Sequence, residues 1–141
     1  GDPECQAILP RLKSDIFKIL INTVNDKLHK TQITWKKEKC MTIVLCSKGY
    51  PGNYKKGKII RNIKNIRLRK NELVFHAGTK LFNQKIFSNG GRVLNFSFLG
   101  NKFLIIRKRI IKLIKKVNWN DGFFRKDIGW KVIKRDENNK R

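Results

Sequence analysis

Carboxylates are scarce in this chain of 141 residues: ten Asp and Glu stand against 34 Lys and Arg, which gives a net charge of +24. Apolar runs are short, and none approaches the roughly 20 residues that a membrane span needs. The three cysteines, Cys5, Cys40 and Cys46, form no CxxC pair, which argues against a zinc site and a disulfide framework. We therefore expect a cytoplasmic protein without membrane contact and, because residue 1 begins a polar turn, without a signal peptide.

The motifs of common catalytic sites are missing as well. The chain holds no P-loop, no GxSxG and no HExxH. Its two histidines, His29 and His76, lie far apart in the sequence without the spacing of paired ligands. A metal site built from them is therefore not expected.

Apolar and aromatic residues are plentiful by contrast. Hydrophobic residues make up 40% of the chain, with nine Phe and three Trp, which is typical of a globular domain with one core. A charge of +24 commonly indicates a polyanionic partner. Here Lys is spread over the whole length and most aromatics fall inside apolar runs, so we interpret the charge as a solvated surface and expect no specific nucleic-acid partner.

Two stretches have the spacing of amphipathic helices. Between Ser14 and Lys30, apolar residues recur every three or four positions, with Ser14 as the expected N-cap. Residues 102–117 show the same period, with Lys and Arg on the other side. For residues 118–141 we expect two aromatic-rich segments with a short strand or two, followed by a polar tail that frays.

Strands are predicted between the two helices. Residues 40–47, CMTIVLCS, form a β-rich apolar run that ends before the turn at residues 49–52. From residue 57 to residue 100, short apolar runs alternate with Gly and Asn, which favours antiparallel strands joined by tight turns. The predicted class is therefore α+β.

Several turn segments carry polar residues that suit anion binding. They are GYPGNYKKGK (49–58), FHAGTK (75–80) and NGGRVL (89–94). Glycine lets backbone N–H groups approach a ligand, and a neighbouring Lys or Arg can hold phosphate or carboxylate. Taken one by one, the same patterns also fit hairpin turns with solvated Lys and Arg side chains. In FFRKDIGW, residues 125–127 form either a surface salt bridge or an anion-handling corner.

Five stretches, taken in order, resemble the C-terminal third of the phosphoribosylamine-glycine ligases, also called glycinamide ribonucleotide synthetases. They are GDPECQ, LCSKGYPGNYKKGKII, VFHAGTK, GGRVLNFSFLG and NWNDGFFRKDIGW. The resemblance implies an ATP-grasp, ATP-dependent carbon–nitrogen ligase of purine biosynthesis. In such an enzyme, ATP phosphorylates the glycine carboxylate and 5-phosphoribosylamine attacks the glycyl phosphate. The implied cofactors of the full-length enzyme are ATP and Mg²⁺ or Mn²⁺, and its substrates are glycine and 5-phosphoribosylamine.

The resemblance also implies a division of the chain. Residues 1–35 would be the last loop and helix of the ATP-grasp domain, and residues 36–141 the C-terminal domain, a small antiparallel barrel-like sheet with flanking helices. The N-terminal domain, most of the ATP-grasp domain and the expected metal ligands would lie upstream of Gly1. We therefore expect the isolated chain to be inactive and to bind no cofactor tightly, and a separate chain that supplies the missing domains is left open.

Substrate-binding candidates follow from the positions that match the family's motifs. Residues 1–4 match the end of a family signature. The motif positions matched by His76, Thr79, Lys80 and Arg92 are expected to face the substrate cleft, and Lys80 and Arg92 are the candidates for holding anionic groups. No catalytic residue is assigned, and no metal ligand is expected in this chain. The candidates are Asp2, Glu4, His76, Thr79, Lys80, Arg92, Arg125, Lys126 and Asp127.

An alternative function of another class stays open. The amphipathic helix expected at residues 102–116 is basic, which is also typical of a binding module for anionic surfaces or nucleic acid. The two hypotheses differ in the place of the helix's apolar side, which is docked on the sheet in the ligase and free in the binding module.

Overall fold

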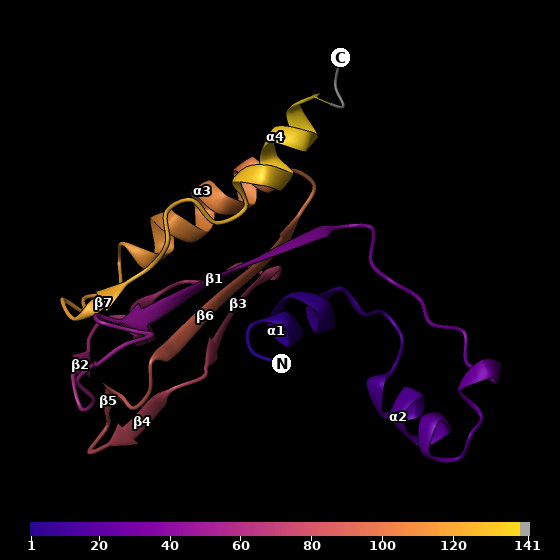
Figure 1. Ribbon diagram of the computed structural model, residues 1–141, viewed down its shortest axis with the longest axis horizontal. Coiled ribbons are helices and arrows are strands. Elements are labelled where there is room, and N and C mark those ends of the chain that lie inside the picture. The colour runs from indigo at the N-terminus through magenta and orange to yellow at the C-terminus, as the bar shows by residue number, and fades with distance from the viewer. Residues whose placement is uncertain (139–141) are drawn as a thin grey trace.

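A four-stranded antiparallel sheet is the centre of the computed structural model, which describes residues 1–138 (Figure 1). In spatial order its strands are β3 (Glu72–His76), β6 (Arg92–Gly100), β1 (Lys39–Ser47) and β7 (Gly122–Phe123). A three-stranded sheet contains β2 (Ile59–Ile60), β5 (Lys85–Ser88) and β4 (Thr79–Phe82). The helices are α1 (Glu4–Ile8), α2 (Ile16–Val24), α3 (Phe103–Ile114) and α4 (Trp130–Asn138), with 3₁₀ turns at Leu9–Arg11, Leu28–Lys30 and Ile63–Asn65. The predicted α+β class with antiparallel pairing is confirmed.

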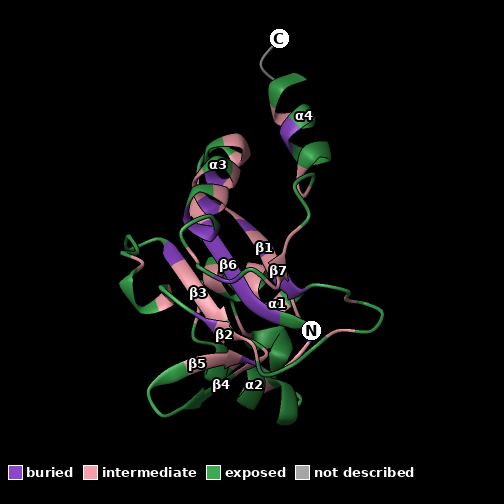
Figure 2. Ribbon diagram, turned by 90° about the vertical axis from the view of Figure 1, so that its left-hand side faces the viewer, coloured by how far each residue is buried: buried purple, intermediate pink, exposed green. Residues whose placement is uncertain are grey.

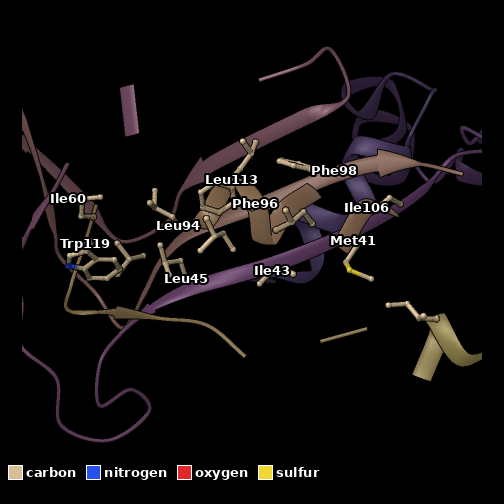
Figure 3. Packing of buried hydrophobic residues seen from close by; sticks show 14 residues of the cluster. Met41, Ile43, Leu45, Ile60, Leu94, Phe96, Phe98, Ile106, Leu113 and Trp119 are labelled. Atoms are coloured by element: carbon tan, nitrogen blue, oxygen red, sulfur yellow. The ribbon is translucent and has the colours of Figure 1, made fainter. Parts of the chain in front are cut away.

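One face of the central sheet is apolar and carries the core. Alternate residues of a strand point to opposite faces, and the register pairs Met41 with Phe98 and Ile43 with Phe96 on one face. α3 lies across that face, as Figures 1 and 3 show. The buried cluster comprises Met41, Ile43, Leu45, Ile60, Val93, Leu94, Phe96, Phe98, Ile106, Ile110, Leu113, Ile114, Trp119 and Ile133.

The helix predicted at residues 102–117 is confirmed as α3, and its apolar side is docked. Ile106, Ile110, Leu113 and Ile114 are buried in the core cluster, so they are not free to enter an anionic surface. This removes the basis of the binding-module alternative. Within residues 1–138, no helix is both long and apolar enough to cross a bilayer.

The opposite face of the central sheet carries buried polar residues at its centre. Asn95 and Ser97 of β6 are completely inaccessible, and the Ser97 hydroxyl lies 2.7 Å from the Thr42 hydroxyl of β1. α1 contacts β1 and β6 and lies on the other side of the sheet from α3 (Figure 1). A short N-terminal helix therefore covers this face beside Asn95, a buried polar residue that requires hydrogen-bond partners.

The helix predicted between Ser14 and Lys30 is shorter than expected. α2 begins at Ile16, because the Asp15 carboxylate accepts a hydrogen bond of 2.8 Å from the Phe17 N–H and so provides the N-cap. The Ser14 hydroxyl, the predicted cap, lies 2.9 Å from the Thr34 hydroxyl instead. The helix ends at Val24 because Asp26 adopts a left-handed backbone conformation with φ of 58°.

The C-terminal segment is partly as predicted. The short strand is confirmed as β7, but the fraying tail is wrong through residue 138, where α4 forms. α4 is held at Ile133, which is buried in the core, and at Asp136, which forms an ion pair of 2.6 Å with Lys39. The end of the predicted tail, residues 139–141, lies outside the described residues.

Candidate functional site

Three of the predicted glycine-containing segments meet at one end of the central sheet. They comprise residues 49–54 after β1, residues 77–78 between β3 and β4, and residues 89–92, which lead into β6. We call this meeting point the glycine-loop junction. Because β1 and β6 are antiparallel, as are β3 and β6, the ends of β1 and β3 lie beside the start of β6.

Backbone hydrogen bonds tie the three loops together. The Ser47 N–H donates to the Gly91 carbonyl at 2.8 Å, and the Ser47 hydroxyl donates to the Gly90 carbonyl at 2.7 Å. On the other side, the Asn89 N–H donates to the Gly78 carbonyl at 2.7 Å. The segment before β6 is therefore held from both sides, which fixes the backbone that carries Arg92.

Two glycines allow this close approach. A Cβ on Gly78 would lie 2.5 Å from the Arg92 carbonyl oxygen, closer than real Cβ atoms come to another heavy atom. A Cβ on Gly91 would overlap the ring of Tyr50. The glycines of FHAGTK and NGGRVL are thus explained by packing between loops.

The N-terminal turn reaches the same junction through Asp2. The Arg92 Nε lies 3.1 Å from Asp2 Oδ2, and the Arg92 Nη1 donates to the Asp2 carbonyl at 2.8 Å. The other carboxylate oxygen accepts from the Asn95 amide at 2.7 Å and from the Gln6 amide at 3.0 Å. The Asp2 carboxylate therefore contacts three donor side chains, one from α1 and two from β6.

Arg92 is the partly exposed cation of the junction, and a buried cysteine, Cys46, lies beside it. The Arg92 side chain is 42% exposed, and its Nη2 has no hydrogen-bond partner within residues 1–138. Cys46 lies across from Arg92 in the β1–β6 pairing. Burial raises the pKa of the Cys46 thiol and the positive charge of Arg92 offsets this only in part, so the thiol stays protonated at neutral pH.

His76 and Thr79 lie at the edge of the junction and contact each other. The His76 Nδ1 is 2.9 Å from the Thr79 hydroxyl across the turn that joins β3 to β4. The imidazole of exposed His76 and the hydroxyl of half-buried Thr79 provide hydrogen-bonding groups there. Within residues 1–138, no hydrogen bond joins either side chain to Arg92.

Lys80 occupies a neighbouring depression. It lines an open cavity of about 560 Å³ together with Lys56, Phe82 and Phe87. Lys80 and Arg92 share no ion pair or hydrogen bond among the described residues. The structure therefore places the two predicted anion-binding residues beside the same loop, without bringing their side chains together.

Glu4 is exposed in the first turn of α1. Its carboxylate makes no side-chain hydrogen bond or ion pair within the part of the chain that the structure describes. Asp2 and Glu4 therefore differ sharply: Asp2 is held by Arg92 and Asn95, whereas Glu4 faces solvent.

Residues 125–127 form a separate corner. The Arg125 guanidinium contacts the Asp127 carboxylate at 2.7 and 3.2 Å, and both groups are exposed. The hydrogen bond from Arg125 lowers the pKa of Asp127. The Lys126 carbonyl accepts a hydrogen bond from Arg107 of α3, which covers the apolar face of the sheet. The structure thus gives this corner a surface salt bridge and does not join it to the glycine-loop junction.

Sequence reasoning missed two polar partners of Asp2. Asn95 is 0% exposed and Gln6 comes one turn of α1 after Asp2. The signal that was available is the alternation in RVLNFSFLG, where Asn95 and Ser97 interrupt an apolar strand at every second position. That pattern indicates a polar inner face.

No side-chain cluster suited to a metal is found. Within residues 1–138, no group of three or more His, Cys, Asp and Glu is arranged to hold a metal ion. The described residues therefore offer no such cluster for a resident divalent cation.

Comparison with known proteins gives consistent matches over most of the chain. The sequence profile of the family "Phosphoribosylglycinamide synthetase, C domain" matches residues 40–131. A phosphoribosylamine-glycine ligase of Agrobacterium fabrum is 44% identical over 137 residues, covering 97% of this chain and 32% of the relative. The enzyme of the same name from Escherichia coli K12 is 37% identical over 139 residues, covering 98% and 32%.

A solved structure agrees with the sequence relatives. The crystal structure of phosphoribosylamine-glycine ligase from Thermotoga maritima superposes with a TM-score of 0.66 at 28% identity and covers 90% of this chain and 30% of that one. The chain thus spans about a third of the length of the relatives that it matches.

Proposed function

The chain belongs to the phosphoribosylglycinamide synthetase C-domain family, and from this membership we propose that it is the C-terminal part of a phosphoribosylamine-glycine ligase. The proposed whole enzyme joins glycine to 5-phosphoribosylamine with ATP, and releases glycinamide ribonucleotide, ADP and phosphate. The family match over residues 40–131 is the observation that carries this proposal.

Within that enzyme, residues 1–35 are proposed to be the last part of the ATP-grasp domain and residues 36–141 a barrel-like C-terminal domain. ATP and Mg²⁺ or Mn²⁺ would bind in the part of the enzyme that this chain does not match. The free cysteines of the described residues fit a cytoplasmic setting.

The proposed contribution of this chain is to hold a substrate anion at the glycine-loop junction. The Arg92 guanidinium carries the positive charge. Asp2 contacts its Nε and Nη1, which leaves Nη2 for a ligand. A planar guanidinium that is fixed in this way suits the phosphate or carboxylate groups of the substrates. His76, Thr79 and Lys80 provide further polar groups beside the same loops. Exposed Glu4 and the corner of residues 125–127 stay candidates without a role.

The test uses a fusion in which this chain replaces the matching third of the Escherichia coli ligase. With ATP, glycine, 5-phosphoribosylamine and magnesium, the fusion is expected to release ADP, whereas the isolated chain releases none above background. Arg92→Ala in the fusion should lower kcat/KM at least tenfold, and Arg92→Lys should recover part of the loss because the charge remains. ADP release by the isolated chain would refute its expected inactivity. An Arg92→Ala fusion with unchanged kinetics would refute the proposed role of Arg92.

A further inference from the structure

An open cavity of about 580 Å³ lies at the end of the central sheet opposite the glycine-loop junction. β6 runs from Arg92 at the junction to Gly100 in the lining of the cavity, and a strand of this length spans about 26 Å. Residues at the start of β3 and in the first turns of α3 complete the lining. Figure 2 shows the buried start of β3 (purple) after an exposed loop (green). A small ligand in this cavity therefore does not reach Arg92.

Apolar side chains form one part of the lining. Phe98 of β6 and Ile106 of α3 line the cavity and belong to the buried core cluster. Ile105 lines it as well and is 61% exposed, although it stands next to a core residue. An apolar ligand group placed on Ile105 would remove this side chain from water, which is favourable. The cavity therefore offers a surface for an apolar or aromatic group.

The rest of the lining is charged, with four cationic side chains and one carboxylate. The carboxylate of Glu72 is buried, and its two oxygens accept from the Arg109 guanidinium at 2.7 and 3.0 Å. One of them also accepts from the Arg69 N–H at 3.0 Å. Glu72 and Arg109 thus neutralise each other and fix the wall between β3 and α3, so the carboxylate does not repel an anion.

The three other cations of the lining are uncompensated. The side chains of Arg69, Lys70 and Lys102 are exposed and form no ion pair within residues 1–138. Together they give the cavity a positive potential beside its apolar surface. A phosphate has several oxygens and can accept hydrogen bonds from more than one of these groups. An apolar surface with a few polar groups around it is typical of a small-molecule site, and the volume is in the usual range.

We propose that this cavity binds a small organic phosphate, a phosphate ester with an apolar or aromatic body such as a nucleoside monophosphate. The body packs on Ile105, and Lys70 and Lys102 hold the phosphate. A nucleic-acid strand fits less well, because strands are held by exposed aromatic side chains on which bases stack, and Phe98, the aromatic residue of this lining, is 2% exposed. The site is separate from the glycine-loop junction, so this inference does not depend on the proposed function.

The experiment is an NMR titration of the chain with AMP, adenosine and inorganic phosphate. AMP should bind with a Kd below about 1 mM, and at least about tenfold more tightly than adenosine or phosphate, because only AMP has both the body and the charge. The amide signals of Asn71 and of residues 99–102 should shift. Those of residues 89–92 at the glycine-loop junction should not.

Charge variants separate this site from the general positive charge of the chain. Lys70→Glu/Lys102→Glu should weaken AMP binding at least about tenfold, and Lys70→Gln/Lys102→Gln should weaken it as well. The matched control is Lys108→Glu/Lys112→Glu, which changes the net charge equally at two exposed positions of α3 outside the lining. It should change the Kd by less than about twofold.

An apolar variant tests the other half of the site. Ile105→Ala should weaken AMP binding at least about threefold, whereas Leu81→Ala on β4, at a position that is 66% exposed, should not change it. Equal losses from the two Lys→Glu double variants, AMP that binds no more tightly than phosphate, or signal shifts at residues 89–92 instead would overturn the inference. A single-stranded oligonucleotide that binds more tightly than AMP, and is weakened equally by both double variants, would assign the charge to nucleic acid and overturn it too.

Discussion

Replacement of Asp2 by Ala tests the organisation of the glycine-loop junction. The Asn95 amide is fully buried and loses its acceptor, which costs about 1–3 kcal/mol. The Arg92 side chain is 42% exposed and is rehydrated, so its lost ion pair contributes only about 0–1 kcal/mol. The loss of the Gln6 hydrogen bond adds about 0.5–1 kcal/mol. We therefore expect Asp2→Ala to weaken the docking of the N-terminal segment by about 2–4 kcal/mol.

Hydrogen exchange at Cys5–Ile8, combined with urea unfolding, measures this effect. Exchange of the α1 amides should accelerate strongly, while the loss in global stability cannot exceed the free energy that docks the segment. Asp2→Asn should lose less, because an amide oxygen still accepts from Asn95. The control is Glu4→Ala, which removes an exposed carboxylate without a side-chain partner in the described chain and should change stability by less than about 0.5 kcal/mol. If Asp2→Ala and Glu4→Ala behave alike, the described junction is not what holds α1.

Three further substitutions test the rest of the account. Burial raises the pKa of Glu72, but hydrogen bonds from Arg109 and the Arg69 N–H outweigh this effect, so the pKa lies below the ordinary 4.5. The stability that ionised Glu72 contributes is therefore present above pH 4.5 and is lost as the pH falls through the lowered pKa. Urea midpoints should therefore show Glu72→Gln destabilised at pH 6 by about 2–4 kcal/mol, with the gap to wild type narrowing toward pH 3; a constant gap would contradict the assigned ion pair. Gly91→Ala should destabilise by at least about 1 kcal/mol in thermal unfolding, because the new methyl group overlaps the Tyr50 ring, and Gly91→Ala/Tyr50→Ala should lose less than the sum of the single changes. Leu113→Ala should cost about 2–5 kcal/mol by denaturant unfolding, since Leu113 is 1% exposed in the core; a loss below about 1 kcal/mol would show that α3 is not docked.

The elements with strong local patterns could be predicted from the sequence. α3 has a continuous helical period and β1 has a β-rich apolar run, and both were located within a few residues. The boundary of α2 was missed because Asp26, which ends the helix by its left-handed conformation, stands in a sequence whose apolar period continues to Leu28. Periodicity reports which side of a helix is apolar but not where its backbone turns.

Contacts between distant residues explain what the sequence did not reveal. α4 is held by the burial of Ile133 in the core and by the ion pair between Asp136 and Lys39. These contacts join residues far apart in the chain, so the polar sequence of α4 resembles a tail. For the site, glycines and neighbouring charges identified the loops that meet at the junction. That Arg92 is held by Asp2, and Asp2 in turn by buried Asn95, follows only from the way that α1 crosses the polar face of the sheet.

The central claim is that this chain supplies the C domain of a phosphoribosylamine-glycine ligase. The most direct measurement is growth without purines of an Escherichia coli strain that lacks its own ligase and carries the fusion of the remaining Escherichia coli part with this chain. We predict growth with the fusion and no growth with the chain alone or with the Arg92→Ala fusion. A fusion that accumulates at the level of the parent enzyme and folds cooperatively, yet does not support growth, would contradict the claim.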